Sequence, residues 1–135
     1  MKMYRIAIDF DGTIVDHRYP RIGKKVDGAF EWMKKWQEAG AMLILWTMRS
    51  GASVREVGGY CAWNGIVFDG MNKGPGDSEW TDSPKVYAHT YVDDAAFGCP
   101  LKPGPLPDSR PVVDWSIVGP DILEQINAFN QSTKN

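Results

Sequence analysis

Short apolar segments alternate with amphipathic or polar ones along the first two thirds of the chain. Residues 5–10, 41–46 and 87–92 are short and rich in aliphatic and aromatic side chains. Such segments are typical of strands that are buried on both faces of a sheet. A further strand is expected to start at 66–68. The pattern therefore predicts four short strands.

The segments between these strands contain helical patterns. Residues 27–39 are expected to form a helix, which Asp27 would cap and Gly40 would end. Its apolar positions recur at i, i+3, i+4 and i+7 on one face, as Ala29, Trp32, Met33 and Trp36. Residues 53–63 form a weaker helical pattern because they contain two adjacent glycines. A closing helix is expected over 121–129.

The remaining segments are predicted to be loops. Residues 16–26 are polar and basic and form a loop or small flap, and 69–84 form a long polar loop. Prolines crowd residues 100–111, which excludes a helix or a central strand there. Residues 130–135 are polar, and we expect them to be a disordered tail.

Strands that alternate with helices predict an α/β domain with a mainly parallel sheet, connected by right-handed crossovers. The chain of 135 residues is long enough for one such domain, which we place at residues 1–129. In sheets of this kind the ligand lies beyond the carboxyl ends of the strands. The polar side chains that follow the strands are therefore the candidate functional groups.

Composition excludes several functional classes. Lys plus Arg total 15 and Asp plus Glu total 17, so the chain lacks the basic excess of a general nucleic-acid binder. No apolar run approaches the roughly 18 residues of a membrane helix, and Asp9 interrupts any signal-peptide core. Cys61 and Cys99 lack metal-ligand spacing, and we interpret them as inert thiols in a reducing cytoplasm.

Two acidic pairs follow predicted strands. Asp9 and Asp11 are two residues apart, so both side chains can face one site, and Gly12 lets the backbone turn sharply after them. Asp93 and Asp94 follow the last strand. Four carboxylates at one edge of a sheet repel one another and invite a cation. Hard oxygen ligands favour Mg²⁺.

Phosphate-binding groups are also expected at this edge. Thr47 ends a strand, and Arg49 and Gly51 follow it, so a hydroxyl, a guanidinium and a turn into a helix are available to a phosphate. Lys85 precedes the last strand and can place a positive charge over the same site. Each feature alone also has a purely structural interpretation, as a strand-end cap or a solvated charge.

Taken together, these residues resemble the haloacid dehalogenase (HAD) superfamily of phosphohydrolases. The four motifs of that family are similar, in order, to Asp9-Phe10-Asp11-Gly12-Thr13, to Thr47 after Leu43-Ile44-Leu45-Trp46, to Lys85, and to Tyr91-Val92-Asp93-Asp94. Lys73 competes with Lys85 for the third motif. The resemblance implies a Rossmann-like three-layer sandwich. The short connections imply that it lacks a large cap domain.

The resemblance also implies a mechanism. Asp9 would attack phosphorus and form an aspartyl-phosphate, and Asp11 would act as the general acid and base. Mg²⁺ would be bound by Asp9, by the Asp11 backbone carbonyl and by Asp93, with Asp94 in support. The phosphoryl group would contact Thr47, Arg49 and Lys85. An acid at position 11 is typical of the family's phosphatases and phosphotransferases rather than its dehalogenases.

Substrate and partners are less defined. A phosphorylated substrate is expected, and an open site would suit an exposed phosphate or a lid lent by a second copy in a homo-oligomer. The flap residues His17, Arg18, Tyr19 and Arg21, together with Arg49 and Trp80, are candidates for specificity. A signalling receiver domain is disfavoured because its phosphorylated Asp ends a middle strand, where this chain has Thr47. A catalytically silent phosphate-binding domain remains an alternative.

Overall fold

The computed structural model describes residues 2–134, and its centre is a four-stranded parallel sheet. The strand order is β3-β2-β1-β4. β1 is Arg5–Ile8, β2 is Met42–Leu45, β3 is Gly70–Met71 and β4 is Thr90–Val92. The predicted α/β class and parallel sheet are confirmed.

The register of the sheet aligns the residues that leave it. Ile8 at the end of β1 lies opposite Leu45 of β2 and Val92 of β4. The two central strands and their neighbour therefore end at the same level. Whatever follows them, including Asp9 and Asp93, emerges at one edge of the sheet.

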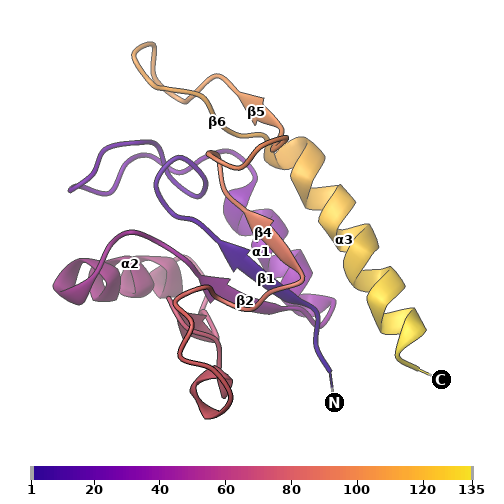
Figure 1. The fold of residues 1–135 in the computed structure, drawn as a ribbon. Helices are drawn as coiled ribbons and strands as arrows, with labels where there is room; N and C mark the ends of the chain where they lie inside the picture. The colour runs from indigo at the N-terminus through magenta and orange to yellow at the C-terminus, as the bar shows by residue number, and fades with distance from the viewer. Residues whose placement is uncertain (1, 135) are drawn as a thin grey trace.

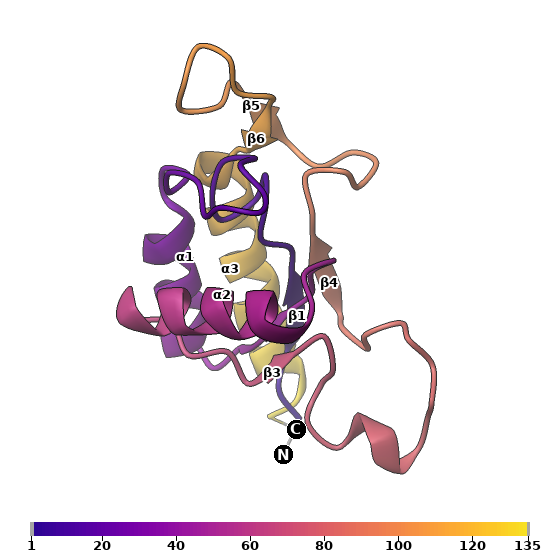
Figure 2. The ribbon, with the colours of Figure 1, turned by 90° about the vertical axis from the view of Figure 1, so that its left-hand side faces the viewer.

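Three helices cover one face of the sheet (Figures 1 and 2). They are α1, Ala29–Glu38; α2, Gly51–Trp63; and α3, Trp115–Ser132. Their apolar faces enclose the main core with the strands. Trp36 and Trp115 pack with ring centroids 5.1 Å apart, and the Trp36 indole donates to the Gly119 carbonyl at 3.0 Å. The face of the sheet that the helices cover is thus closed by aromatic packing between α1 and α3.

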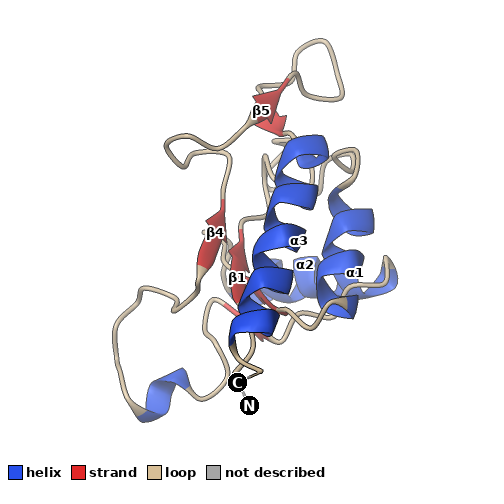
Figure 3. Ribbon diagram, turned by 90° about the vertical axis from the view of Figure 1, so that its right-hand side faces the viewer, coloured by secondary structure: helices blue, strands red, loops and turns tan. Residues whose placement is uncertain are grey.

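The opposite face is covered by a loop rather than by helices (Figures 2 and 3). Val86 and Ala88 pack against Ala7 and Ile44 of the sheet. This loop contains a single short 3₁₀ helix, Asp77–Glu79. The fold is therefore a Rossmann-like sandwich without a large cap, in which a long irregular segment forms the third layer.

A small antiparallel ribbon follows β4 (Figure 1). It consists of β5, Leu101–Lys102, and β6, Val112–Val113, joined by residues 103–111, here called the Pro-rich loop. The Val113 amide donates to the Gly12 carbonyl at 3.1 Å. The ribbon therefore lies against the turn that follows β1. As predicted, the prolines exclude a helix and a central strand from this region.

Two helices begin elsewhere than predicted. Asp27 does not cap α1; the residue before α1 is Gly28, with φ 87°, and no side chain caps the helix there. α3 begins six residues early because the Asp114 side chain accepts from the Ser116 amide and so starts the helix ahead of Pro120. Proline inside a helix removes one hydrogen bond but does not here end it.

The predicted disordered tail is partly wrong, because α3 continues through residue 132. The Asn130 side chain donates to the Ala39 carbonyl at 2.8 Å and so ties this last turn to the end of α1. Residue 135 lies outside the described part of the chain. None of the helices within residues 2–134 combines the length and the apolar character that crossing a bilayer requires.

Two strands are shorter or displaced. No strand forms at 66–68; the chain first meets β2 at Asp69, whose amide and carboxylate both bond to the Leu43 backbone. Pairing proper begins only at Gly70. β4 loses its predicted first residues because the His89 imidazole, rather than a backbone carbonyl, accepts from the Arg5 amide at 2.9 Å.

Candidate functional site

The candidate site is a cavity of about 520 Å³ at the edge where the parallel strands end. β1 contributes Asp9 and Asp11, β2 contributes the segment after Leu45, and β4 contributes the segment after Val92. The lining residues are Asp9, Asp11, Tyr19, Thr47, Met48, Arg49, Asp93 and Ala95. The predicted convergence of the first, second and fourth motif segments is therefore present.

Three carboxylates gather on one side of this cavity, and we call Asp9, Asp93 and Asp94 the acidic cluster. Each offers an oxygen, and these oxygens lie within 4.8 Å of one another. The Thr13 hydroxyl, which is fully buried, donates to Asp9 Oδ2 at 3.1 Å and accepts from the Asp94 amide at 3.2 Å. Thr13 thus joins the end of β1 to the end of β4.

The electrostatics of the acidic cluster are unfavourable without a cation. Burial, then the negative charges of Asp93 and Asp94 and a hydrogen bond with Asp94, raise the pKa of Asp9 to about 8, against which the Thr13 hydrogen bond acts only weakly. Burial and the two neighbouring carboxylates therefore both penalise the charged form of Asp9, and a bound cation would relieve this penalty. The acidic cluster could hold a cation.

The donor set fits a hard divalent cation. All side-chain donors are carboxylate oxygens, which suit Mg²⁺ and Ca²⁺ and not the softer metals. Within residues 2–134, no hydrogen bond reaches the Asp11 carbonyl oxygen, so this backbone ligand is also available. The acidic residues after β1 and β4 are therefore the ones that would bind a hard divalent cation such as Mg²⁺.

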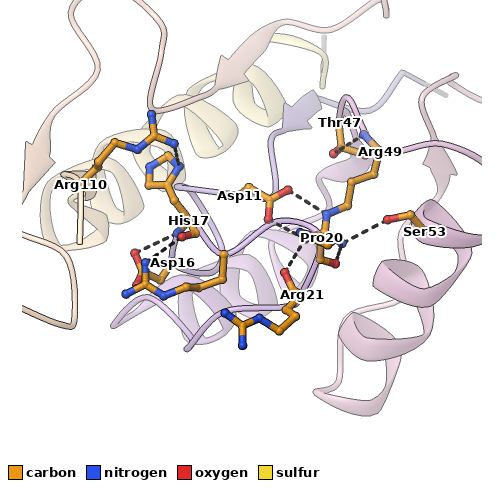
Figure 4. A network of polar contacts seen from close by, with 10 residues as sticks. Asp11, Asp16, His17, Pro20, Arg21, Thr47, Arg49, Ser53 and Arg110 are labelled. Carbon is orange, nitrogen blue, oxygen red and sulfur yellow. Dashed lines mark hydrogen bonds and ion pairs between the residues drawn. The ribbon is translucent and has the colours of Figure 1, made fainter. Parts of the chain in front are cut away.

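Asp11 lies on the other side of the cavity and does not join the acidic cluster. Its carboxylate accepts two hydrogen bonds from Arg49, from Nε to Oδ2 and from Nη2 to Oδ1, both at 2.8 Å (Figure 4). This is the bidentate geometry in which a guanidinium binds a carboxylate most strongly. The residue predicted to be the general acid is thus engaged in an internal ion pair.

Arg49 has no donor left for a phosphate, contrary to the role expected from the sequence. Besides Asp11, it donates to the carbonyls of Pro20 and Arg21 and to the Ser53 hydroxyl, at 2.8–3.2 Å. All five of its N–H groups are therefore used. The side chain is 1% exposed, and its hydrogen bond with Asp11 raises the pKa of Arg49. Arg49 organises the flap and Asp11 rather than the substrate.

Thr47 occupies the position predicted for it. It lines the cavity, its hydroxyl oxygen accepts from the Arg49 amide at 3.1 Å, and its own amide donates to the Asn72 side chain at 2.7 Å. The Thr47 hydroxyl hydrogen is left for a ligand. Asn72 was missed from the sequence; its φ of 58° and its second bond, to the Arg49 carbonyl, make it the residue that shapes this turn.

The structure does not place either candidate lysine in the cavity. Lys85 and Lys73 are exposed and line a separate depression of about 140 Å³. Lys85 Nζ lies 5.9 Å from the centre of the Tyr91 ring. The buried neighbour Val86, whose carbonyl accepts from the Tyr91 hydroxyl at 2.6 Å, anchors the backbone so that Lys85 lies outside the site.

Two basic side chains of the predicted flap lie against acidic side chains of the same chain. Arg18 pairs with Asp16 and Asp108 at 3.3 and 2.9 Å, and His17 lies 3.3 Å from Asp94. Arg21 contributes its backbone carbonyl to Arg49. Trp80 packs edge-on against Tyr87 and does not line the cavity. Of the specificity candidates, Tyr19 is the one that lines the cavity with an exposed ring.

Comparison with known proteins gives one informative relative. No family model and no curated protein matches the chain. A solved structure described as that of the conserved protein coded by a locus from Bacteroides thetaiotaomicron is similar, with 35% identity and a TM-score of 0.76. The similarity covers 92% of this chain and 93% of that one.

Proposed function

The chain belongs to the same family as the conserved protein from Bacteroides thetaiotaomicron, and from the site it carries we propose that it is an Mg²⁺-dependent phosphomonoesterase of the haloacid dehalogenase type. The observation that carries this proposal is the acidic cluster, with Asp9 at the end of the central strand and its pKa raised to about 8. The order of the motifs along the sequence supports the same conclusion.

Asp9 is the proposed nucleophile because it ends the central strand and opens into the cavity. One of its carboxylate oxygens forms a bond to phosphorus while the bond from phosphorus to the ester oxygen breaks. Water then attacks phosphorus and releases phosphate, which restores the Asp9 carboxylate. Asp9, Asp93, Asp94 and the Asp11 carbonyl would hold the Mg²⁺, which neutralises phosphoryl charge and lets an anionic nucleophile approach an anionic substrate.

Asp11 is the proposed proton donor to the leaving oxygen and the later base for the water. Both of its oxygens accept a hydrogen bond from Arg49, so the proton would occupy a remaining lone pair of one of these oxygens. Arg49 therefore fixes the orientation of the Asp11 carboxylate. The Thr47 hydroxyl, which lines the same cavity, donates to a phosphoryl oxygen.

A catalytically silent phosphate-binding domain is the second candidate. Two observations favour it: the Asp11–Arg49 pair occupies the proposed general acid, and Lys85 lies outside the cavity. Without that lysine, the positive charge available to a phosphoryl group would come from the metal ion alone. A phosphotransferase, with an acceptor other than water, would use the same residues.

The first prediction separates these functions. Wild type is assayed for phosphate release from p-nitrophenyl phosphate and a panel of metabolite phosphates, with Mg²⁺ and with a chelator. We expect Mg²⁺-dependent turnover that falls by at least about a thousandfold in Asp9→Asn, since the nucleophile is lost. Arg21→Ala, at an exposed flap residue, is the control and should keep its activity. Equal silence of wild type and Asp9→Asn on every ester supports the binding domain instead.

A further inference from the structure

The Pro-rich loop, residues 103–111, is not explained by the proposed reaction, yet it contacts the site through polar side chains. It lies far along the chain from the flap, and the two meet beside the turn after β1 (Figures 1 and 4). Its end is fixed there by the bond from the Val113 amide to the Gly12 carbonyl. The contacts between loop and flap form a continuous path to the acidic cluster.

The path starts at Asp16, a fully buried flap residue. Its carboxylate accepts from the Ser109 hydroxyl at 2.7 Å and from the His17 amide at 2.9 Å. Arg18 lies between Asp16 and Asp108 and pairs with both. A buried charge with this many partners fixes the position of the flap against the Pro-rich loop.

The path continues through His17. Arg110 Nη2 lies 2.8 Å from His17 Nδ1. A guanidinium can only donate, so Nδ1 is the acceptor, and the ring proton of a neutral His17 lies on Nε2. Nε2 faces two oxygens at 3.3 Å, the Pro111 carbonyl and Asp94 Oδ2. Arg110 therefore selects the tautomer that presents a proton toward Asp94.

The turn at Gly12 makes this approach possible. Its φ is 88°, and a side chain there would lie 2.6 Å from Asp94 Oδ2 and would collide with the His17 ring. His17 and Asp94 thus meet over a backbone that has no Cβ. This contact is independent of the Thr13 contacts that hold the Asp94 amide.

We propose that Arg110 and His17 are positioning residues that hold Asp94 in the acidic cluster for a divalent cation, and that the Pro-rich loop exists to deliver Arg110. This inference rests on the proposed function. The arrangement places the His17 imidazole between the Arg110 guanidinium and the Asp94 carboxylate. Asp94 is oriented through the imidazole, whereas Asp11 is held directly by Arg49.

Calorimetric titration of the metal-free protein with Mg²⁺ and with Mn²⁺ tests this. Loss of a group that orients a metal ligand lowers metal affinity by about 10- to 100-fold, and we expect at least tenfold weaker binding in Arg110→Ala and His17→Asn. His17→Gln, whose amide reaches the position of Nε2, should recover most of the affinity. Arg21→Ala is the matched control, because it removes the same charge from the exposed flap without touching His17.

The direction in which metal affinity changes distinguishes a positioning role from a simple effect of net charge. Removal of a positive charge by itself favours cation binding, so a pure charge effect would tighten binding in both arginine variants. Arg110→Ala that binds as tightly as Arg21→Ala, or His17→Asn that binds as tightly as wild type, overturns the proposal. Arg110 is exposed, so its variant keeps the test valid if a His17 variant fails to fold.

A second measurement needs no metal. The nitrogen shifts of His17 in ¹⁵N NMR should show the Nε2–H tautomer in wild type and a mixture in Arg110→Ala. A wild type with this tautomer that binds no divalent cation would overturn the proposed function together with the role given to Asp94. Wild-type cation binding that Arg110→Ala leaves intact would overturn only the positioning role.

Discussion

The two sides of the cavity treat their carboxylates in opposite ways. On one side, Asp11 meets the buried guanidinium of Arg49 in a bidentate pair. On the other, Asp9, Asp93 and Asp94 meet mainly one another, with a threonine hydroxyl and an imidazole as neighbours. The first side is complete without a ligand, and the second is not. This difference is the reason that the proposed function assigns a cation to the acidic cluster.

The largest expected effect on folding comes from removing the Arg49 guanidinium, which pairs with Asp11 on the first side of the cavity. Arg49→Ala leaves Asp11 unpaired and also removes the donors to the flap carbonyls. We expect the free energy of unfolding to fall by about 3–5 kcal/mol, as for other broken buried pairs. Urea denaturation measures this, with Arg49→Lys as the control that keeps the charge but loses the fork. A loss below about 1 kcal/mol would show that the pair does not stabilise the flap.

Removing a negative charge from the acidic cluster, by Asp9→Asn, is expected to stabilise the metal-free protein. The raised pKa of Asp9, about 8 against an ordinary 3.8, means that the folded state binds the proton more tightly than the unfolded state. The stability this contributes is fully present below about pH 4 and is lost as pH rises through 8. Without metal, Asp9→Asn should therefore exceed wild type in stability by about 2–4 kcal/mol at pH 9, and by less at pH 5.

Urea denaturation at the two pH values, with a chelator and then with Mg²⁺, measures this effect. Mg²⁺ should narrow the gap at pH 9, because wild type gains a ligand that the variant binds less well. A variant that is less stable than wild type at pH 9 in the chelator would contradict the repulsion inferred for the cluster.

The smallest expected effect comes from removing the Thr13 hydroxyl, which joins two residues of the acidic cluster. Thr13→Val keeps the shape of the buried side chain but removes the hydroxyl that joins Asp9 to the Asp94 amide. We expect a loss of about 1–2 kcal/mol in unfolding free energy, the usual penalty for a buried donor left unsatisfied. Thr13→Ser retains the hydroxyl and should fall between this variant and wild type. Thermal and urea unfolding give the comparison.

Much of the site could be predicted because it depends on local pattern. The segments before Asp9, Thr47 and Asp93 are short and rich in apolar residues, and parallel strands end at one edge. These residues line the cavity as expected. Lys85 does not, because the path of an irregular loop depends on Val86 and Tyr91, which pack together only in the folded chain.

The helices show the same division. The face of α1 was predictable because its apolar spacing is local, and Ala29, Met33 and Trp36 are buried. The start of α3 was not, because the cap at Asp114 and the Trp36–Gly119 hydrogen bond, which form in the folded chain, favour a start before residue 121. Asn72 and Arg110 carried no signal in the sequence beyond their residue types.

The sequence by itself determined the strand ends, and with them the acids that the chain brings to one edge, because hydrophobic period and turn residues act over a few positions. Only the tertiary structure decided which partner each charged side chain contacts. Arg49 pairs with an acid 38 positions away, and Arg110 meets His17 across 93. Such partners are chosen by the packing of distant segments, which brings together side chains far apart in the sequence and excludes water from the buried Arg49.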